Sequence, residues 1–210
     1  PERMALFSRR APALQRLGNR DWKTEAELAE IAAELRQDRP RPADAIPLCW
    51  HQDAEARRIG TELLLHKPSV ALGLSIVELG MDRPVRDRRY ALQVVALFAD
   101  ALASETVERL VADADSGKQR AGWELVLLMR VGAVRNRLLE RATREAPTGV
   151  RLAALKVMGE SGAATTMVPL LIELTGHEDW RLVQAAFEAL AEVNDDRVLD
   201  VMLRTLSDGT

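Results

Sequence analysis

Hydrophobic and polar positions recur along this chain with a period of about 31 residues. The pattern is clearest at residues 150–159, and ungapped copies of it occur at 57–64, 88–95, 119–126 and 183–190. One column of this alignment holds only small residues: Gly60, Ala91, Gly122, Ala154 and Ala186. Two positions later, every copy has a polar residue: Glu62, Gln93, Glu124, Lys156 and Glu188. A fixed period of this length predicts a solenoid of stacked helical hairpins.

The small-residue column has a physical explanation if the first helices of successive hairpins lie side by side. A side chain larger than Ala at the centre of such a contact would push the two helices apart. Large apolar residues then fill the seam between layers. Burying each of them should stabilise the fold by about 1.5 to 3 kcal/mol. Two sets of residues fit this role: Leu63, Val94, Leu125 and Val157, or the neighbouring Leu64, Val95, Val126 and Met158.

Helix-breaking residues divide the repeated region into five regular hairpins. Pro68, Gly132 and Gly162 each stand between the two helices of one hairpin, where a proline or glycine ends a helix. The predicted hairpins span residues 53–81, 82–116, 117–147, 148–177 and 178–207.

The N-terminal quarter of the chain departs from the repeat. Thr24 is a predicted helix cap with Glu27 in capping-box spacing, and Pro40 ends that helix. A short second helix interrupted by Pro47 completes a degenerate capping hairpin over 24–52, as expected of a terminal repeat. Residues 1–23 are basic and show little periodicity, which predicts a flexible leader. We interpret residues 1–3 as an addition ahead of a native start at Met4.

Composition supports helix nearly throughout. The chain of 210 residues is 47% hydrophobic but only 4% aromatic, and strand-like alternation is absent. A single cysteine, Cys49, indicates a reducing compartment, and no apolar run is long enough for a bilayer, so we expect a cytoplasmic protein. The predicted fold is all-α: a right-handed α-solenoid of about six antiparallel helical hairpins, forming one domain over 24–210.

Two stretches resemble a known repeat. The pattern of Val150, Arg151, Ala153, Ala154, Leu155 and Gly159 resembles the HEAT repeat, and so does His177-Glu178-Asp179-Trp180-Arg181 running into residues 185–190. A period near 31 is most similar to the short bacterial, phycobilisome-lyase-type HEAT-like repeats. The resemblance covers residues 53–207 and implies a curved scaffold for protein partners, with a few branches that bind nucleic acid or do chemistry.

The residues that usually carry chemistry are scattered. His51, His66 and His177 lie in different repeats, and none has a metal-binding spacing to another, so we predict no metal, no cofactor and no catalytic residue. HEAT-like hydroxylases hold iron through several His-Glu pairs, and this chain has one, at His177-Glu178. We interpret that pair as the start of the fifth hairpin, where acids favour the helix dipole.

The tryptophans bear on a nucleic-acid function. HEAT-like alkylpurine DNA glycosylases place Trp and Asp along a basic groove, yet no Trp here is followed one turn later by Asp. Trp123 shares the repeat column of Leu92 and Leu155, which predicts a core position. Trp180 precedes a helix and is predicted to pack on the preceding loop.

The most distinctive predicted surface is the second helix of the third hairpin. Residues 118–156 contain nine Lys or Arg against three acids, whereas 157–210 contain three against ten. Arg137, Arg141 and Arg144 fall on one helical face, and arginine suits bidentate recognition of carboxylate or phosphate. The alternative is a solvated face partly neutralised by Glu140 and Glu145. The predicted partner-binding residues are Arg130, Arg135, Arg137, Arg141 and Arg144.

The last predicted helix has more apolar surface than one neighbour can bury. Leu199 and Leu203 lie one turn apart on a strip of their own, and are predicted to stay exposed as an interface for a second copy or for chain beyond Thr210. The residues predicted to face inward are Val198, Val201, Met202 and Leu206.

These features favour a non-catalytic scaffold that binds another protein with an acidic surface. A nucleic-acid-binding, glycosylase-like protein is the alternative, which a net charge of −3 disfavours. A chromophore lyase is a third hypothesis, suggested by the repeat subtype alone.

Overall fold

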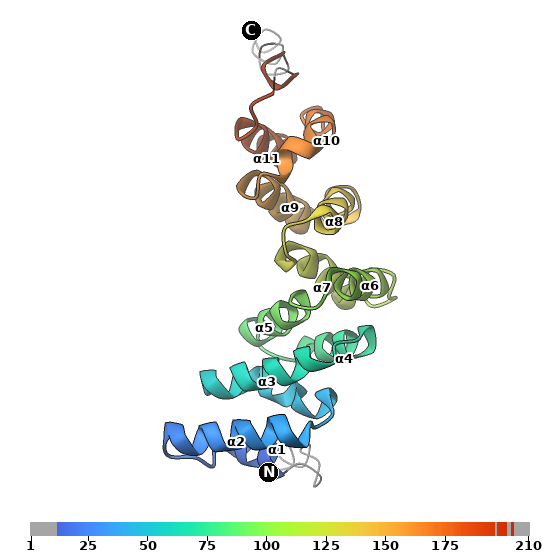
Figure 1. The fold of residues 1–210 in the computed structure, drawn as a ribbon. Helices are drawn as coiled ribbons and strands as arrows, with labels where there is room; N and C mark the ends of the chain where they lie inside the picture. Colours follow the sequence, from blue (N-terminus) through green and yellow to red (C-terminus); the bar gives the residue numbers. More distant parts are fainter. Residues whose placement is uncertain (1–11, 196, 201–202, 204–210) are drawn as a thin grey trace. The chain divides into compact units, whose positions relative to one another are not determined.

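The computed structural model describes residues 12–195, 197–200 and 203. Every regular element in these ranges is helical, which confirms the all-α prediction of a solenoid-type fold (Figure 1). The chain forms two compact units that divide between Ala121 and Gly122. The sequence predicted one domain over 24–210 and did not indicate this division. Each repeat of a solenoid contacts only its neighbours, so a stack of repeats can form more than one compact unit along the chain.

The first unit begins with α1 (Pro12–Asn19) and α2 (Glu25–Asp38). The prediction of a flexible leader over 1–23 is wrong for its described part, because α1 is helical and packs against α2 with Leu14 and Leu17 fully buried. The predicted start of α2 is confirmed: the Thr24 side chain accepts a hydrogen bond from the backbone N–H of Glu27. Residues 1–11, which hold the rest of the predicted leader, lie outside the described residues.

Next come η2 (Pro42–Trp50), a 3₁₀-helix, and α3 (Ala54–His66). Pro47 lies inside η2, where its missing N–H is incompatible with regular α-helical bonding. The predicted pairing of η2 with α2 is corrected: η2 packs along α3, and α2 packs along α1. The capping hairpin therefore consists of α1 and α2, and the Asp53 side chain caps the start of α3.

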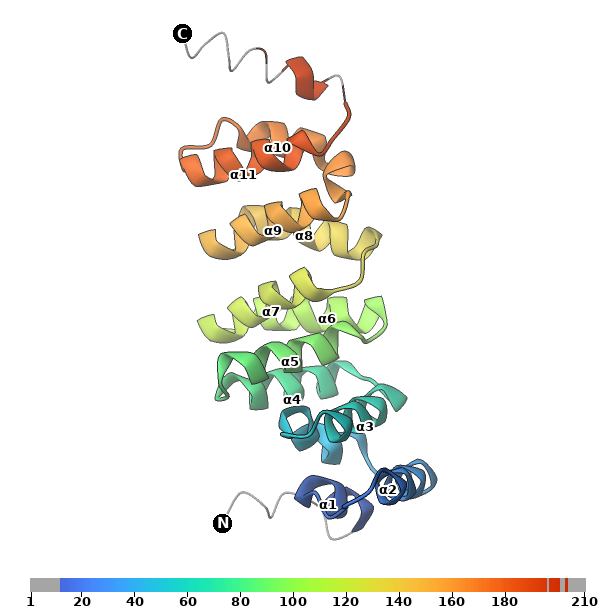
Figure 2. The same cartoon turned by 90° about the vertical axis from the view of Figure 1, so that its left-hand side faces the viewer.

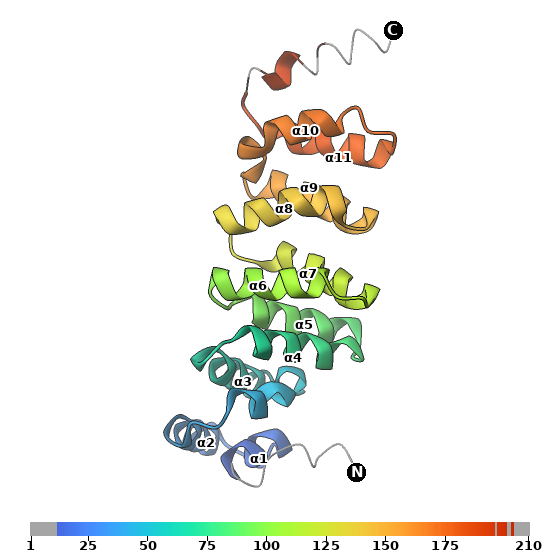
Figure 3. The same ribbon diagram turned by 90° about the vertical axis from the view of Figure 1, so that its right-hand side faces the viewer.

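The first unit continues with α4 (Val70–Met81), α5 (Val85–Ala96) and α6 (Asp100–Val111). Helix α4 packs against both α5 and α6 (Figure 3). Helix α7 (Ser116–Leu128) begins in the first unit and ends in the second.

The second unit contains the rest of α7 and then α8 (Ala133–Glu145), α9 (Thr148–Glu160), η3 (Ala163–Met167), α10 (Val168–Leu174) and α11 (Trp180–Ala191). Helix α9 packs between α8 and α11 (Figure 2). The predicted second helix of the fourth hairpin is divided into η3 and α10, with a proline in the first turn of α10. Gly162 precedes η3 with φ of 70°, a left-handed conformation that glycine adopts at little cost.

The small-residue column is buried in both units. Ala91, Ala154 and Ala186 have no exposed surface, and Gly60 and Gly122 are buried as well. Their neighbours differ from the prediction in the first unit. Gly60 contacts η2, and Ala91 contacts α4, where a methyl group on Gly80 would lie 3.2 Å from the Ala91 Cβ. The close approach therefore joins unlike helices there, rather than successive first helices.

The structure also decides between the two seam sets. Leu64, Val95, Val126 and Met158 are all buried. In the other set Val94 and Leu125 are buried as well, but Leu63 and Val157 keep partial exposure, so only the first of these sets is buried throughout. In the polar column, Glu62, Gln93, Lys156 and Glu188 are exposed as predicted, and Glu124 is half-buried. None of the helices in the described ranges has the length and apolar content needed to cross a membrane.

Candidate functional site

Helix α8 holds four of the five predicted partner-binding arginines, and one of the four is not available to a partner. Arg135 is only 6% exposed, and its Nη2 donates to the backbone carbonyl of Leu127 at 3.3 Å. Its buried Nε has no acceptor within the described residues, and burial lowers the pKa of the guanidinium. The prediction of Arg135 as a binding residue is corrected, because its position on α8 turns it towards the interior of the second unit.

Arg141 is partly exposed and is held by two neighbours. Its Nε donates to the Glu145 carboxylate at 2.7 Å, and its guanidinium lies 5.5 Å from the centre of the Trp123 ring. A cation over an aromatic face is attracted by the ring quadrupole. Trp123 is buried, as its repeat column predicted.

Arg144 forms a bidentate pair with Glu173 of α10. The two guanidinium nitrogens Nη1 and Nη2 lie 2.9 and 3.0 Å from the two carboxylate oxygens. The hydrogen bond to Arg144 is the main cause that lowers the pKa of Glu173. This pair links α8 to α10, so the arginine side chain serves contacts within the unit.

Arg130 and Arg137 remain as accessible charges. Both are exposed, and no carboxylate within the described part of the chain forms an ion pair with either. We use the name α8 arginine surface for the solvent-facing side of α8 and of the turn before it, which carries Arg130, Arg137, Arg141 and Arg144. Arg130 and Arg137 can bind an external anion directly, whereas Arg141 and Arg144 already have partners within the chain.

The predicted apolar strip near the C-terminus is exposed at both described positions. Leu199 is 60% and Leu203 is 64% exposed, while Val198 is 3% exposed and faces inward. The other residues predicted to face inward, Val201, Met202 and Leu206, lie outside the described residues.

One exposed aromatic residue differs from its prediction. Trp180, the first residue of α11, is 68% exposed and does not pack on the preceding loop. Its neighbour Asp179 instead caps the helix and pairs with Arg181. Trp is enriched among the residues that contribute most of the binding energy of protein interfaces. Trp180 is therefore a candidate contact for a partner protein, which periodicity alone could not identify.

Two histidines have local structural contacts. The Nδ1 atoms of His51 and His177 accept from the backbone N–H two residues later, in Asp53 and Asp179, and these aspartates cap α3 and α11. No group of three or more His, Cys, Asp or Glu that could hold a metal occurs within the described ranges. Cys49 is buried, which raises the pKa of its thiol to about 12 and leaves it a poor nucleophile.

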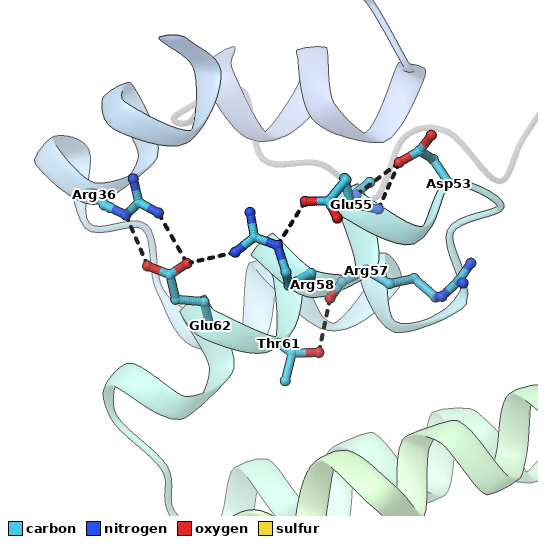
Figure 4. Close-up of polar contacts among 8 residues, drawn as sticks. Arg36, Asp53, Glu55, Arg57, Arg58, Thr61 and Glu62 are labelled. Atoms are coloured by element: carbon cyan, nitrogen blue, oxygen red, sulfur yellow. Dashed lines mark hydrogen bonds and ion pairs between the residues drawn. The ribbon is translucent and has the colours of Figure 1, made fainter. Parts of the chain in front are cut away.

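Helix α3 carries a chain of ion pairs that the repeat pattern did not reveal. Arg36 of α2 contacts Glu62 at 2.9 Å, and Arg58 contacts both Glu55 and Glu62 (Figure 4). Arg57 extends away from this chain in the same view. The charge of Arg58 is therefore neutralised within the first unit, whereas Arg57 has no carboxylate partner among the described residues.

Comparison with protein families identifies the repeat. Residues 136–210 match the model described as HEAT repeats. No curated protein and no solved structure matches the chain. The matched segment includes α9 and α11, which supply two copies of the repeated stretch and the buried Ala154 and Ala186. The resemblance drawn from the sequence over residues 53–207 is confirmed for the segment from residue 136 to residue 210, which carries HEAT repeats.

Proposed function

We propose that this chain is a non-catalytic scaffold that binds another protein on the surface of its stacked helices. HEAT repeats generally mediate protein–protein interaction, which supports the class of function. The observation that carries the proposal is the exposure of Arg130 and Arg137 without carboxylate partners in the described ranges. An acidic patch on a partner would neutralise both and would form charge-assisted hydrogen bonds.

The α8 arginine surface favours a protein partner over a nucleic acid. Glu145 and Glu173 lie among its arginines and would repel a continuous run of phosphates. The net charge of −3 opposes nonspecific attraction to a polyanion as well.

The test uses affinity capture from native lysate, with and without nuclease, on the wild type and an Arg130→Glu, Arg137→Glu variant. We expect capture to survive nuclease and the captured partner to bind the variant at least about tenfold more weakly, with the loss reduced at high salt. Arg109→Glu on α6 is the matched control, because Arg109 is an exposed arginine of the first unit. Equal affinity for both variants would remove the α8 arginine surface from consideration, and nuclease-sensitive capture would favour the nucleic-acid alternative.

We propose Leu199 and Leu203 as a second contact, for another copy of the chain. Their exposed fractions of 60% and 64% support this role, since two large exposed apolar side chains one helical turn apart form an apolar patch of the kind found at protein interfaces. Sedimentation of the wild type beside a Leu199→Glu, Leu203→Glu variant tests it. A wild type that stays monomeric at all concentrations would contradict this contact and leave the α8 proposal untouched.

A further inference from the structure

Two adjoining hollows lie on α3 and α5 of the first unit, and Arg57 and Tyr90 line both. The smaller has a volume of about 220 Å³ and is also lined by Arg89 and Gln93 of α5. The larger, about 630 Å³, is open to solvent and is also lined by Ala54, Thr61 and Leu65 of α3.

Arg57 is fixed in place by uncharged groups. Its Nη1 donates to the backbone carbonyls of His51 and Gln52 at 2.7 and 2.9 Å. Its guanidinium lies 5.7 Å from the centre of the Tyr90 ring, and the Tyr90 hydroxyl is 3.1 Å from the Thr61 hydroxyl. The cation is thus positioned before any ligand arrives, and its charge is not balanced by a carboxylate among the described residues.

Arg89 adds a second unbalanced charge to the smaller hollow. It is exposed, and no acid in the described ranges forms an ion pair with it. The other arginines of the two hollows differ in this respect. Arg58 is paired with Glu55 and Glu62 (Figure 4). Arg86 lies 3.4 Å from Asp87.

A half-buried guanidinium is stabilised by an anion that completes its hydrogen bonds. Arg57 has Nε and Nη2 without acceptors in the described part of the chain, and a carboxylate accepts two parallel N–H bonds in the fork geometry of arginine. The pairing would form in a partly desolvated hollow, where a charged hydrogen bond contributes more than it does in open water.

Size and surroundings indicate which anion fits. The smaller hollow, at about 220 Å³, is below the roughly 300 to 1,000 Å³ of pockets that enclose drug-sized ligands. The larger hollow, at about 630 Å³, reaches that size but is open to solvent and would not enclose such a ligand. Glu62 lines the larger hollow and Asp87 the smaller one, and these two carboxylates would repel a continuous run of phosphates more than a single carboxylate. Ala54 lies one helical turn from Arg57 on α3 and lines the larger hollow, so it offers an apolar contact to the side chain next to the acid.

We propose that the α3–α5 hollows bind a segment of a partner protein through one acidic side chain, whose carboxylate pairs with Arg57 and Arg89, while an adjacent apolar side chain of the segment contacts Ala54. This site is separate from the α8 arginine surface. The inference rests on the proposed function only in taking another protein as the partner.

The test is selection of a random-peptide phage library on the full chain, followed by fluorescence anisotropy of the selected peptide. We expect selected sequences to share an Asp or Glu beside an apolar residue. Replacing that acid by its amide should weaken binding about tenfold or more, because a charged hydrogen bond is lost. The Arg89→Gln variant should lose affinity to a similar extent, and Arg109→Gln should retain it.

Three outcomes would overturn the proposal. The first is a selection whose peptides share no acidic residue, and the second is full peptide affinity of the Arg89→Gln variant. The third is displacement of the peptide by inorganic phosphate or a single-stranded oligonucleotide at a far lower concentration than acetate requires. Arg57→Gln is measured in parallel, with its melting temperature, because Arg57 also holds a loop. Amide chemical-shift mapping then locates the peptide. Shifts confined to residues after 121 would place it elsewhere and refute the α3–α5 site, whereas the Arg130→Glu, Arg137→Glu variant separately decides the α8 proposal.

Discussion

Gly60 of α3 lies directly against Leu48 of η2, so that a methyl group on Gly60 would overlap the Leu48 Cβ. Both residues are buried. Gly60 is one member of the small-residue column that defines the repeat, and Leu48 belongs to a 3₁₀-helix outside that repeat. The contact shows that the column serves close helix packing even where the neighbouring element is irregular.

Gly60→Ala should therefore destabilise the protein by about 1 to 3 kcal/mol, since overpacking forces the backbones of α3 and η2 apart. Gly149→Ala is the matched control: it is also helical, and nothing lies within 4 Å of its added Cβ. That change should stabilise by about 0.4 to 1 kcal/mol through the unfolded chain. Chemical denaturation measures both, and equal stability of the two variants would refute the close contact.

The buried alanines of the second unit make a parallel prediction. Ala154 and Ala186 have no exposed surface, so replacing either by Leu should cost about 1 to 3 kcal/mol. Ala191→Leu, at an exposed position of the same helix as Ala186, should change stability by less than about 0.5 kcal/mol. Thermal melting within a degree of the wild type for both buried variants would disprove the assignment of this column to the helix contacts.

Arg135→Met should raise stability by about 1 kcal/mol. The substitution keeps most of the side-chain length, removes a buried charge whose Nε lacks an acceptor in the described residues, and leaves one backbone carbonyl to find another donor. Urea denaturation of the variant is the measurement. A clear loss of stability would show that the hydrogen bond to Leu127 outweighs the desolvation of the guanidinium.

The Arg144–Glu173 pair should be visible as pH dependence. The Glu173 pKa is lowered in the folded protein, so the pair stabilises above the unfolded pKa of about 4.3 and this contribution disappears as pH falls through the lower folded value. Glu173→Gln should therefore lower the melting temperature at pH 7 and have little effect near pH 2. A difference that stays constant from pH 7 to pH 2 would show that charge is not its cause.

The sequence alone was enough to predict the features of local structure in this chain. The period predicted the helices, Thr24 predicted a cap, and the spacing of Leu199 and Leu203 predicted two exposed apolar positions. Each of these depends on neighbours within about one or two helical turns, which the sequence specifies directly. The HEAT resemblance follows from the same local periodicity.

The partners of individual charged and aromatic side chains were decided by tertiary structure. Arg135 and Arg137 are two residues apart on one helix, yet one is buried and the other exposed. Arg144 meets Glu173 and Arg57 meets Tyr90 across successive repeats, at separations of 29 and 33 residues. Such contacts depend on the offset and rotation between packed helices, and a small change in either moves a side chain from solvent to core. The periodicity of this chain therefore determines its helices and its repeat class, whereas the packing of one helix on the next determines which arginines remain available to a partner.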